Sequence, residues 1–380
     1  MRWCGRSNAG KGQATAVTGT DKRPLRRRLL VNGAVVLAST VVSLMVVEVG
    51  FRLYATHLLK TRAATPPLPV VALVAKAHQP SNYPEPVFEY GGNLSFPDHP
   101  NFTDSAGLRG PERTVEKPPN TVRIAGLGDS MMSGDLYPAE QTFLFALERL
   151  LNEATTPGAR FEAINFAVAG YNTEDEAGIL RHKALAYAPD WVLLGVVGND
   201  RERAAYCRVR DANGPARLVS RYSIENAVPF STGFGPEGRP WWACSALARW
   251  VHHCVYSRRD HYAGIERFRA AFAEIATACR RQGIRFLPVI LTEDVEVSQK
   301  ENPRALWHQL VCETAESEGV PVLDMYPVMI EHLKQEGLAS WNRYWTALRD
   351  NHPTPEGHRV IARLLFEKLR ALGILDPRPR

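Results

Sequence analysis

From residue 121 to the C-terminus, short apolar runs alternate with longer segments of helical periodicity. A continuous apolar run of five to seven residues is typical of a strand that is buried on both faces. Alternation of such strands with helices predicts an α/β domain with a parallel sheet covered on both sides. The strands are expected at 122–127, 161–167, 191–197, 284–290 and 320–324, and the helices at 141–153, 173–187, 262–282, 302–317 and 355–371.

Two intervals depart from this alternation. Residues 201–261 are rich in Gly, Pro and aromatic side chains, which indicates an insertion at the carboxyl edge of the sheet, where open α/β folds bind ligands. Residues 55–120 are rich in proline and weakly periodic, which is typical of a spacer that leads into an extended segment packed on the domain. The predicted organisation is a basic tail at 1–28, an apolar segment at 29–50, a linker and lead-in at 51–118, and a folded domain at 119–380.

The positive charge of the chain is concentrated at its N-terminus. The formal net charge is +6, but residues 1–28 contain eight Lys or Arg and one acidic residue. The other 352 residues contain 38 basic and 39 acidic side chains, so the folded domain is close to neutral. A broad basic surface is therefore not expected, and nucleic acid is excluded as a partner of the domain.

An uncharged apolar segment follows the basic tail. Residues 29–47 carry no charge, and nineteen residues at about 1.5 Å rise per residue just span a hydrocarbon core of roughly 30 Å. Arg26, Arg27 and Arg28 directly precede the segment, so the positive-inside rule predicts a cytoplasmic N-terminus. The expected location is the inner membrane, crossed once by residues 29–50, with the domain in the periplasm. A cleaved signal peptide is the competing interpretation, but the run is longer than the usual 7–15 apolar residues, roughly, and no convincing cleavage site follows it.

Five cysteines lie in the exported part of the chain. Five is an odd number, so at least one is expected to stay unpaired or to pair between chains. Cys279 and Cys312 sit in helical patterns and are expected to be buried thiols. The better disulfide candidates are Cys207, Cys244 and Cys254. The pair His252-His253 near Cys244 and Cys254 matches no standard zinc spacing, so no metal site is expected.

Three well-known motifs are incomplete in this sequence. Segment 5–11 fits the start of a P-loop, but Gly12 stands where a Ser or Thr must bind magnesium. Met131 occupies the third glycine position of the dinucleotide fingerprint that begins at Gly126. Met132 occupies the second glycine position of the G-x-S-x-G nucleophile elbow. No cofactor is therefore expected.

Four polar blocks follow consecutive elements of the predicted sheet. Ser130 ends the run Gly128-Asp129-Ser130, Gly170 follows the second strand, Asn199 follows the third, and His352 precedes the last helix. Each has an ordinary structural explanation, namely a helix N-cap, a turn glycine, an Asx turn and a polar loop. Their occurrence together and in this order predicts a serine hydrolase, in which a histidine base activates the serine hydroxyl and N–H groups bind an oxyanion.

At these blocks the chain resembles the SGNH hydrolases, also called the GDSL esterase and lipase family, over about residues 121–370. The segment 101–113 resembles the lead-in of membrane-anchored bacterial members. The resemblance implies a flavodoxin-like three-layer α/β/α sandwich with a five-stranded parallel sheet. It also implies that Ser130 is the nucleophile, that His352 is the base, and that the N–H groups of Ser130 and Gly170 form the oxyanion hole with the Asn199 amide.

The acidic member of the triad departs from the common pattern of this family. The family usually has Asp-x-x-His, whereas Arg349 stands three residues before His352 and Asp350 stands two before it. A shortened Asp-x-His spacing is familiar among such bacterial proteins, so Asp350 is expected to orient the imidazole, with a backbone carbonyl as the alternative. His358 resembles the histidine at the start of the family's last helix and is expected to be structural.

These features predict a membrane-anchored serine esterase that forms an acyl-enzyme on Ser130. The expected substrate is a small-molecule or glycan ester, such as an acetyl ester on a cell-envelope glycan. An O-acyltransferase of the same fold is one alternative, although a single transmembrane segment offers no route for a cytoplasmic acyl donor. A non-catalytic carbohydrate-binding or assembly protein is the other. The sequence leaves the substrate and the oligomeric state open.

Overall fold

The centre of the protein is a five-stranded parallel sheet. A computed structural model describes residues 23–63, 75–97, 99–156, 158–210, 216–220, 241–291, 305–345 and 352–375. The strands are β3 (Thr121–Leu127), β4 (Arg160–Asn165), β5 (Trp191–Val196), β8 (Arg285–Ile290) and β9 (Leu323–Asp324). They lie in the order β4-β3-β5-β8-β9, and each neighbouring pair is parallel. This is the strand order of a flavodoxin-like fold, so the predicted sheet and fold class are confirmed.

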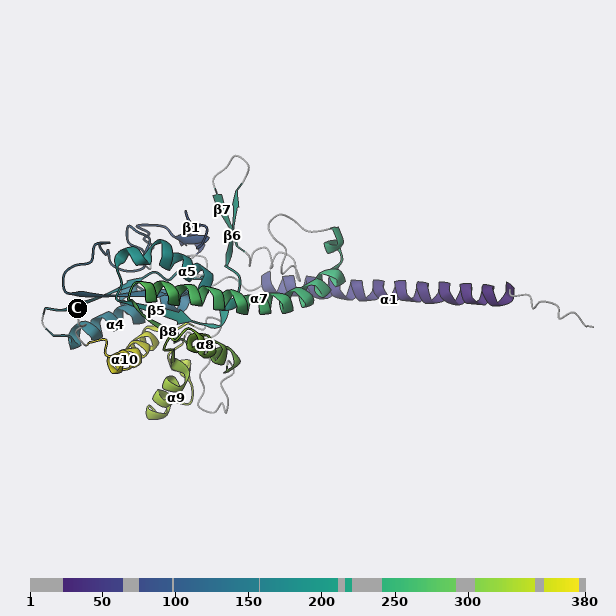
Figure 1. Ribbon diagram of the computed structural model, residues 1–380. Coiled ribbons are helices and arrows are strands. Elements are labelled where there is room, and N and C mark those ends of the chain that lie inside the picture. Colours follow the sequence, from purple (N-terminus) through teal and green to yellow (C-terminus); the bar gives the residue numbers. More distant parts are fainter. Residues whose placement is uncertain are drawn as a thin grey trace, which may run out of the picture.

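Alternate residues of the strands face two separate cores. On β5, Val192, Leu194 and Val196 belong to one core, and Trp191 and Leu193 belong to the other. The first core is covered by α5 (Thr173–His182), α7 (Ala246–Arg281) and α8 (Ala305–Ser317). The second is covered by α4 (Phe143–Ala154), α9 (Met325–Gln335) and α10 (Pro355–Ala371). Figure 1 shows α4 and α10 on one side of the strands and α5 on the other.

The helices differ from the sequence prediction in two places. Helix α7 begins at Ala246 instead of residue 262, so its first half lies in the predicted insertion. That half has no apolar face packed on the sheet, because its first deeply buried residue after Ala246 is Gly264. Helix α9 was not predicted, although four of its side chains are buried, at Met325, Met329, His332 and Leu333. The rest of the insertion that the structure describes comprises the antiparallel pair β6 (Tyr206–Arg210) and β7 (Ala216–Ser220) and a short 3-10 helix at Trp241–Cys244.

The lead-in to the sheet is part of the folded body. It contains the antiparallel pair β1 (His78–Pro80) and β2 (Phe88–Tyr90). Phe88, Tyr90 and Phe102 are fully or almost fully buried and belong to the first core. The contacts between these aromatic rings and the sheet fix the lead-in next to the carboxyl edge, where β3 and β4 end.

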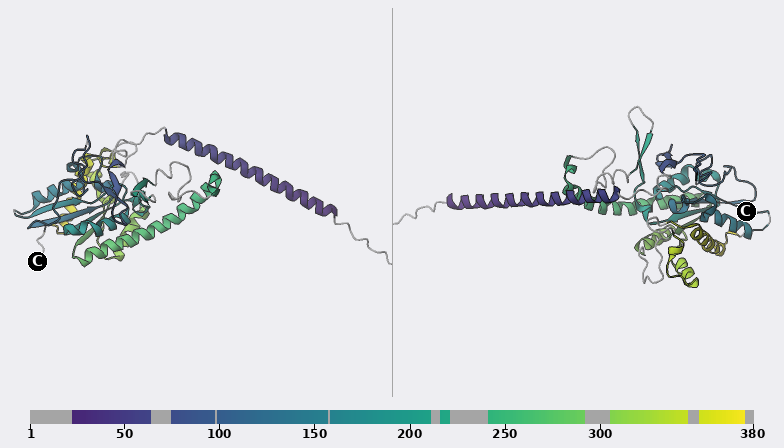
Figure 2. Two further views of the ribbon diagram at one scale, coloured as in Figure 1. Left: turned by 90° about the horizontal axis from the view of Figure 1, so that it is seen from above. Right: turned by 180° about the vertical axis from the view of Figure 1, so that it is seen from behind.

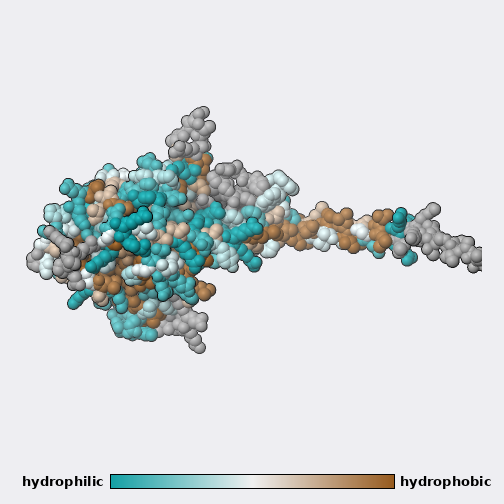
Figure 3. All heavy atoms as spheres, in the orientation of Figure 1, coloured by the Kyte–Doolittle hydropathy of each residue, from teal (hydrophilic) through white to brown (hydrophobic). Residues whose placement is uncertain are grey.

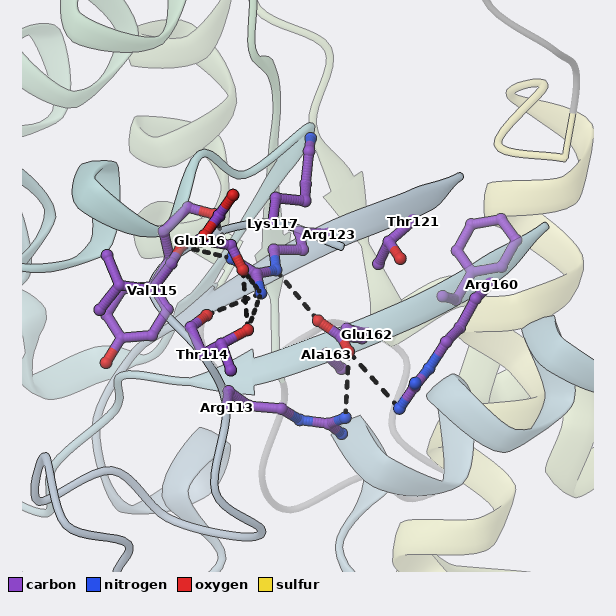
Figure 4. Close-up of polar contacts among 12 residues, drawn as sticks. Arg113, Thr114, Val115, Glu116, Lys117, Thr121, Arg123, Arg160, Glu162 and Ala163 are labelled. Atoms are coloured by element: carbon purple, nitrogen blue, oxygen red, sulfur yellow. Dashed lines mark hydrogen bonds and ion pairs between the residues drawn. The ribbon is translucent and has the colours of Figure 1, made fainter. Parts of the chain in front are cut away.

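At the opposite edge of the sheet, a buried arginine holds the last part of the lead-in (Figure 4). The side chain of Arg123, at the start of β3, is 0% exposed. Its Nε donates to Glu162 Oε2 at 3.0 Å. Its two terminal nitrogens donate to the backbone carbonyls of Thr114, Val115, Glu116 and Tyr187 at 2.7–3.1 Å. Every nitrogen of this buried charge therefore has an acceptor, as a buried charge requires.

Replacing Arg123 by methionine should lower the free energy of unfolding by about 3 kcal/mol, because it leaves Glu162 and four carbonyls without their shared donor. Urea unfolding at neutral pH measures this change. Arg160→Met is the matched control, because Arg160 also pairs with Glu162, at 3.4 Å, but its side chain is 59% exposed. That control should lose less than about 1 kcal/mol. Equal losses in the two variants would contradict the role given to Arg123.

A long apolar helix projects from this body (Figures 1 and 2). Helix α1 (Arg23–Ala63) contains 41 residues. Its segment Arg26–Leu58 contains an 18-residue window with a mean hydropathy of 2.2 and is long and apolar enough to cross a membrane. None of the apolar window is buried, and Figure 3 shows the apolar side chains along the exposed helix. The predicted anchor, residues 29–50, lies within this helix. A membrane-spanning role for α1 stays a prediction.

The second half of α1 contacts the beginning of α7. The carboxylate of Glu48 accepts hydrogen bonds from the backbone N–H groups of Ala246 and Leu247, both at 2.9 Å. It also accepts one from the Ser245 hydroxyl at 2.8 Å. A carboxylate at this position satisfies N–H groups that have no partner within the helix and complements the positive end of the helix dipole. The ring of Phe51 packs against that of Trp250, with ring centroids 5.0 Å apart.

The cysteine prediction holds for one residue and fails for the proposed disulfides. Cys279 is buried, and burial raises its pKa to about 12. Cys312 is only partly buried. None of the five cysteines in the described residues forms a disulfide, so Cys207, Cys244 and Cys254 are free thiols.

Candidate active site

Ser130 lies at the carboxyl end of β3, beside the point where the strand order reverses. It is the first residue of the short helix α3 (Ser130–Ser133), and Asp129 is its N-cap. The turn into this helix needs glycine at position 128, where φ is +156° and a Cβ would lie 2.6 Å from Met132 Cβ. The first N–H of a helix has no partner within the helix. The hydroxyl and the N–H of Ser130 are therefore both presented at the edge where open α/β folds bind ligands.

The structure brings Ser130 and His352 together, although 222 positions separate them in the chain. His352 Nε2 lies 2.7 Å from Ser130 Oγ, which is a hydrogen bond. His352 directly precedes Pro353 and the N-cap of α10, Thr354, whose hydroxyl accepts from Gly357 N at 3.1 Å. Asp350 and Asn351 lie outside the described residues. The predicted role of Asp350 as the residue that orients His352 therefore stays a prediction.

Asn199 reaches the same site from the end of β5. It lies in a one-turn 3-10 helix, Gly198–Arg201, and its Nδ2 donates to Asp129 Oδ2 at 2.9 Å. The other oxygen of Asp129 accepts from Met131 N at 2.9 Å. Asp129 thus joins the turn that carries Ser130 to the turn that carries Asn199. An amide NH₂ group has two hydrogens, and this contact with Asp129 uses one of them.

Gly170 lies in the turn that follows β4, the neighbour of β3 in the sheet. The contact between the two chain segments continues beyond the strands, because Val168 N donates to Gly128 O at 3.2 Å. Tyr171 N donates to Val168 O at 3.1 Å, which closes a turn with Gly170 at its third position. Its φ of +86° is that of a type II turn and favours glycine. Within the described part of the chain, no acceptor contacts the Gly170 N–H.

The sequence pattern of the GDSL-like lipase/acylhydrolase family matches residues 127–360, which is more than half of the chain. The chain belongs to this family. The resemblance to the SGNH, or GDSL, hydrolases that the four blocks indicated is thereby confirmed, and the protein is placed among the carboxylic ester hydrolases. No curated protein is similar enough in sequence to count as a match.

Several solved structures are similar to this GDSL-like hydrolase. An acetyl xylan esterase is 14% identical, with a TM-score of 0.41, over 65% of this chain and 100% of that one. An acetylxylan esterase from Geobacillus stearothermophilus is 14% identical, with a TM-score of 0.40, over 68% of this chain and 97% of that one. A two-domain esterase active on acetylated mannans is 15% identical, with a TM-score of 0.41, over 68% of this chain and 51% of that one.

Three acidic side chains of this GDSL-like hydrolase are buried behind the Ser130 turn. Asp129 is 3% exposed, and burial raises its pKa, although the hydrogen bonds from Met131 and Asn199 act in the opposite direction. Burial also raises the pKa of Glu176, on α5, and of Asp200, beside Asn199, well above their ordinary values. Asp200 accepts from Val197 N and so holds the turn of Asn199. Among the described residues, no group of three or more His, Cys, Asp or Glu is arranged to hold a metal ion.

The sequence analysis assigned no role to Asp129, which the structure places at the centre of the site. The signal was its position between Gly128 and Ser130, because an Asp that precedes a helix can cap it. The contact with Asn199 Nδ2 spans 70 positions in the chain, so no local pattern predicts it. Asp129 therefore combines a local cap with a long-range contact.

His358 of this GDSL-like hydrolase caps a helix beside the site. Its Nδ1 accepts a hydrogen bond from Phe143 N, at the start of α4, at 3.2 Å. It is 1% exposed, and burial, with a smaller effect from His352, lowers its pKa to about 3. A neutral imidazole is required here, because protonated Nδ1 cannot accept a hydrogen bond.

Replacing His358 by glutamine should make stability less sensitive to acid. An unfolded histidine has a pKa of about 6.5, so between that pH and about 3 the unfolded chain binds one more proton than the folded chain at this residue. Stability therefore falls as the pH falls, and His358 alone accounts for about 2 kcal/mol between pH 7 and pH 5. Urea unfolding at the two pH values measures this difference, which His358→Gln should lack. His261→Gln, at an exposed position on α7, should keep the wild-type difference, and the same difference in all three proteins would contradict the prediction.

Proposed function

We propose that this protein is a serine esterase in which Ser130 is the nucleophile and His352 is the general base. The observation that carries the proposal is the 2.7 Å hydrogen bond between His352 Nε2 and Ser130 Oγ. A serine hydroxyl is a weak nucleophile at neutral pH, and a hydrogen-bonded neutral imidazole activates it by accepting its proton. Membership of the GDSL-like lipase/acylhydrolase family supports ester chemistry at this pair.

The proposed oxyanion site comprises three N–H groups. They belong to the backbone of Ser130, the backbone of Gly170 and the side chain of Asn199. Among the residues that the structure describes, no acceptor contacts the Ser130 N–H, and the second hydrogen of Asn199 Nδ2 is not used by Asp129. The turn of Gly170 follows β4, and Val168 at its start donates to the carbonyl of Gly128, two residues before Ser130. Donors that are already in place stabilise an oxyanion without reorganisation during the reaction.

The reaction proceeds in two balanced steps. Ser130 Oγ attacks the ester carbonyl while its proton moves to His352, and the three donors stabilise the tetrahedral oxyanion. The imidazolium then gives the proton to the leaving alcohol, and an acyl-serine remains. Water repeats the sequence, with His352 as its base, and releases the carboxylic acid and free Ser130. In this scheme Asp350 would orient the imidazole.

The substrate we propose is a small acyl ester, such as an acetyl ester on a glycan of the cell envelope. Two features support this class. Family membership supports cleavage of carboxylic esters, and α1 supports attachment to the inner membrane through residues 29–50. Arg26, Arg27 and Arg28 at the start of α1 favour a cytoplasmic N-terminus and a periplasmic domain. Comparing protease cleavage of the domain in intact cells with its cleavage in cells whose outer membrane has been opened tests this orientation. A periplasmic domain should be cleaved only in the opened cells.

Turnover of p-nitrophenyl esters with acyl chains of two to eight carbons tests the proposed function. The full chain in detergent micelles should hydrolyse the acetate fastest, and a fluorophosphonate probe should label Ser130. Absence of both turnover and labelling would contradict a serine esterase. Labelling without hydrolysis, together with acyl transfer to a glycan acceptor, would instead identify an O-acyltransferase.

A further inference from the structure

A tyrosine of the lead-in lies between the turn that follows Ser130 and the turn that contains Gly170. Tyr90, on β2, is 1% exposed. Its hydroxyl accepts a hydrogen bond from Ala169 N at 2.9 Å and donates one to Asp135 Oδ2 at 2.7 Å. Ala169 directly precedes Gly170, and Asp135 follows α3, whose first residue is Ser130. One hydroxyl group therefore links the loops that follow β3 and β4.

Both sides of this link are held firmly. Asp135 Oδ1 accepts from the Ser133 hydroxyl and lies 3.5 Å from Arg109 Nε. Arg109 also donates to the carbonyls of Gly134 and Tyr137, so it fixes the backbone on each side of Asp135. The Tyr90 ring stacks on His78, with centroids 5.2 Å apart and planes 5° apart. Phe102 packs edge-on against the same ring, so the hydroxyl has little freedom to move.

The hydroxyl also has a fixed protonation state. Burial, together with the negative charge of Asp135, raises the pKa of Tyr90 well above its ordinary value. The hydroxyl therefore keeps its proton at physiological pH, and it donates to the carboxylate while it accepts from the Ala169 N–H. This assignment of donor and acceptor is the one that satisfies both partners.

We propose that Tyr90 is a positioning residue for the oxyanion site. Its hydroxyl holds the Val168–Tyr171 turn in register with the Ser130 turn, so that the Gly170 N–H points to the position where the oxyanion forms. The hydroxyl acts on the 168–169 peptide group, which directly precedes the group that carries the Gly170 N–H, and so sets the position from which that group continues. This inference rests on the proposed esterase function. It also gives the lead-in a part in the reaction beyond packing.

Tyr90→Phe tests the proposal, because it deletes one oxygen atom and keeps the buried ring. Misplacing one donor should lower kcat for p-nitrophenyl acetate by about 10- to 100-fold and leave KM within about two-fold, since the substrate carbonyl gains most from these donors in the transition state. Phenylboronic acid, which forms a tetrahedral adduct with an active-site serine, should bind more weakly by a similar factor. A purely structural role would lower the unfolding free energy without this split between kcat and KM.

Tyr206→Phe is the matched control. Its hydroxyl contacts the other side of the same aromatic cluster, at 2.9 Å from His78 Nδ1, and touches neither Ala169 nor Asp135. This variant should keep kcat and boronate affinity within about two-fold of wild type. Urea unfolding of both variants confirms that the assayed protein is folded. An active wild type with unchanged kcat in Tyr90→Phe would overturn the inference and leave the proposed function intact. An inactive wild type that does not label at Ser130 would overturn the proposed function itself.

Discussion

Replacing Ser130 by alanine should reduce kcat for p-nitrophenyl acetate by about four to six orders of magnitude. The substitution removes the oxygen that forms the acyl-enzyme, and the oxyanion donors that remain can only assist direct attack by water. Stability should change by less than about 0.5 kcal/mol, because Ser130 is partly exposed and its hydroxyl contributes little to packing. Steady-state kinetics at saturating substrate and urea unfolding measure the two effects.

A double variant, in which both Ser130 and His352 are replaced by alanine, tests whether the two residues act as a unit. Residues that act as a unit are strongly non-additive, so Ser130→Ala combined with His352→Ala should be no slower than Ser130→Ala alone. His352→Ala by itself should lose nearly as much activity, because the Ser130 hydroxyl then has no base at 2.7 Å to accept its proton. Retention of more than about one hundredth of wild-type kcat in Ser130→Ala would show that another group attacks the ester.

The fold was predictable because its signals are local. The five strands lie within three residues of their predicted starts, as β3 and β8 illustrate, since each is a short apolar run between polar ends. The parallel order follows from the helices between them. The flavodoxin-like order then places the ends of β3, β4 and β5 side by side, so the turns that carry Ser130, Gly170 and Asn199 follow neighbouring strands.

Contacts that depend on distant residues were not predictable. Arg123 is a charged residue within an apolar run, and nothing nearby in sequence indicates that four backbone carbonyls surround it. Tyr90 lies in a proline-rich segment without clear periodicity, and its partners are 45 and 79 positions away. The early start of α7 has only a short local signal, the N-cap Ser245, whose hydroxyl accepts from Ala248 N at 3.1 Å. The other support for this helix start comes from Glu48, 197 positions away from Ser245.

In the proposed mechanism, the oxyanion donors also depend on Asp129. One of its carboxylate oxygens accepts a hydrogen bond from Met131 N, and the other accepts one from Asn199 Nδ2. Asp129 therefore fixes the amide group of Asn199 relative to α3. This arrangement gives Asn199 two separable roles. One hydrogen of its amide donates to Asp129, and the other is the proposed oxyanion donor. A substitution at Asn199 alone does not distinguish the loss of a donor from the loss of the contact with Asp129.

Asn199→Ala should lower kcat by about 10²- to 10³-fold with little change in KM, because a preorganised oxyanion donor acts mainly in the transition state. Asp129→Asn separates the two roles, since it keeps the size of the side chain that contacts Asn199 and removes the charge. If Asn199 only supported Asp129, the double variant would be no slower than Asp129→Asn. Because we expect Asn199 to donate to the oxyanion, Asn199→Ala should still reduce kcat by at least about 30-fold in the Asp129→Asn background. A smaller reduction would assign the oxyanion site to the Ser130 and Gly170 N–H groups alone.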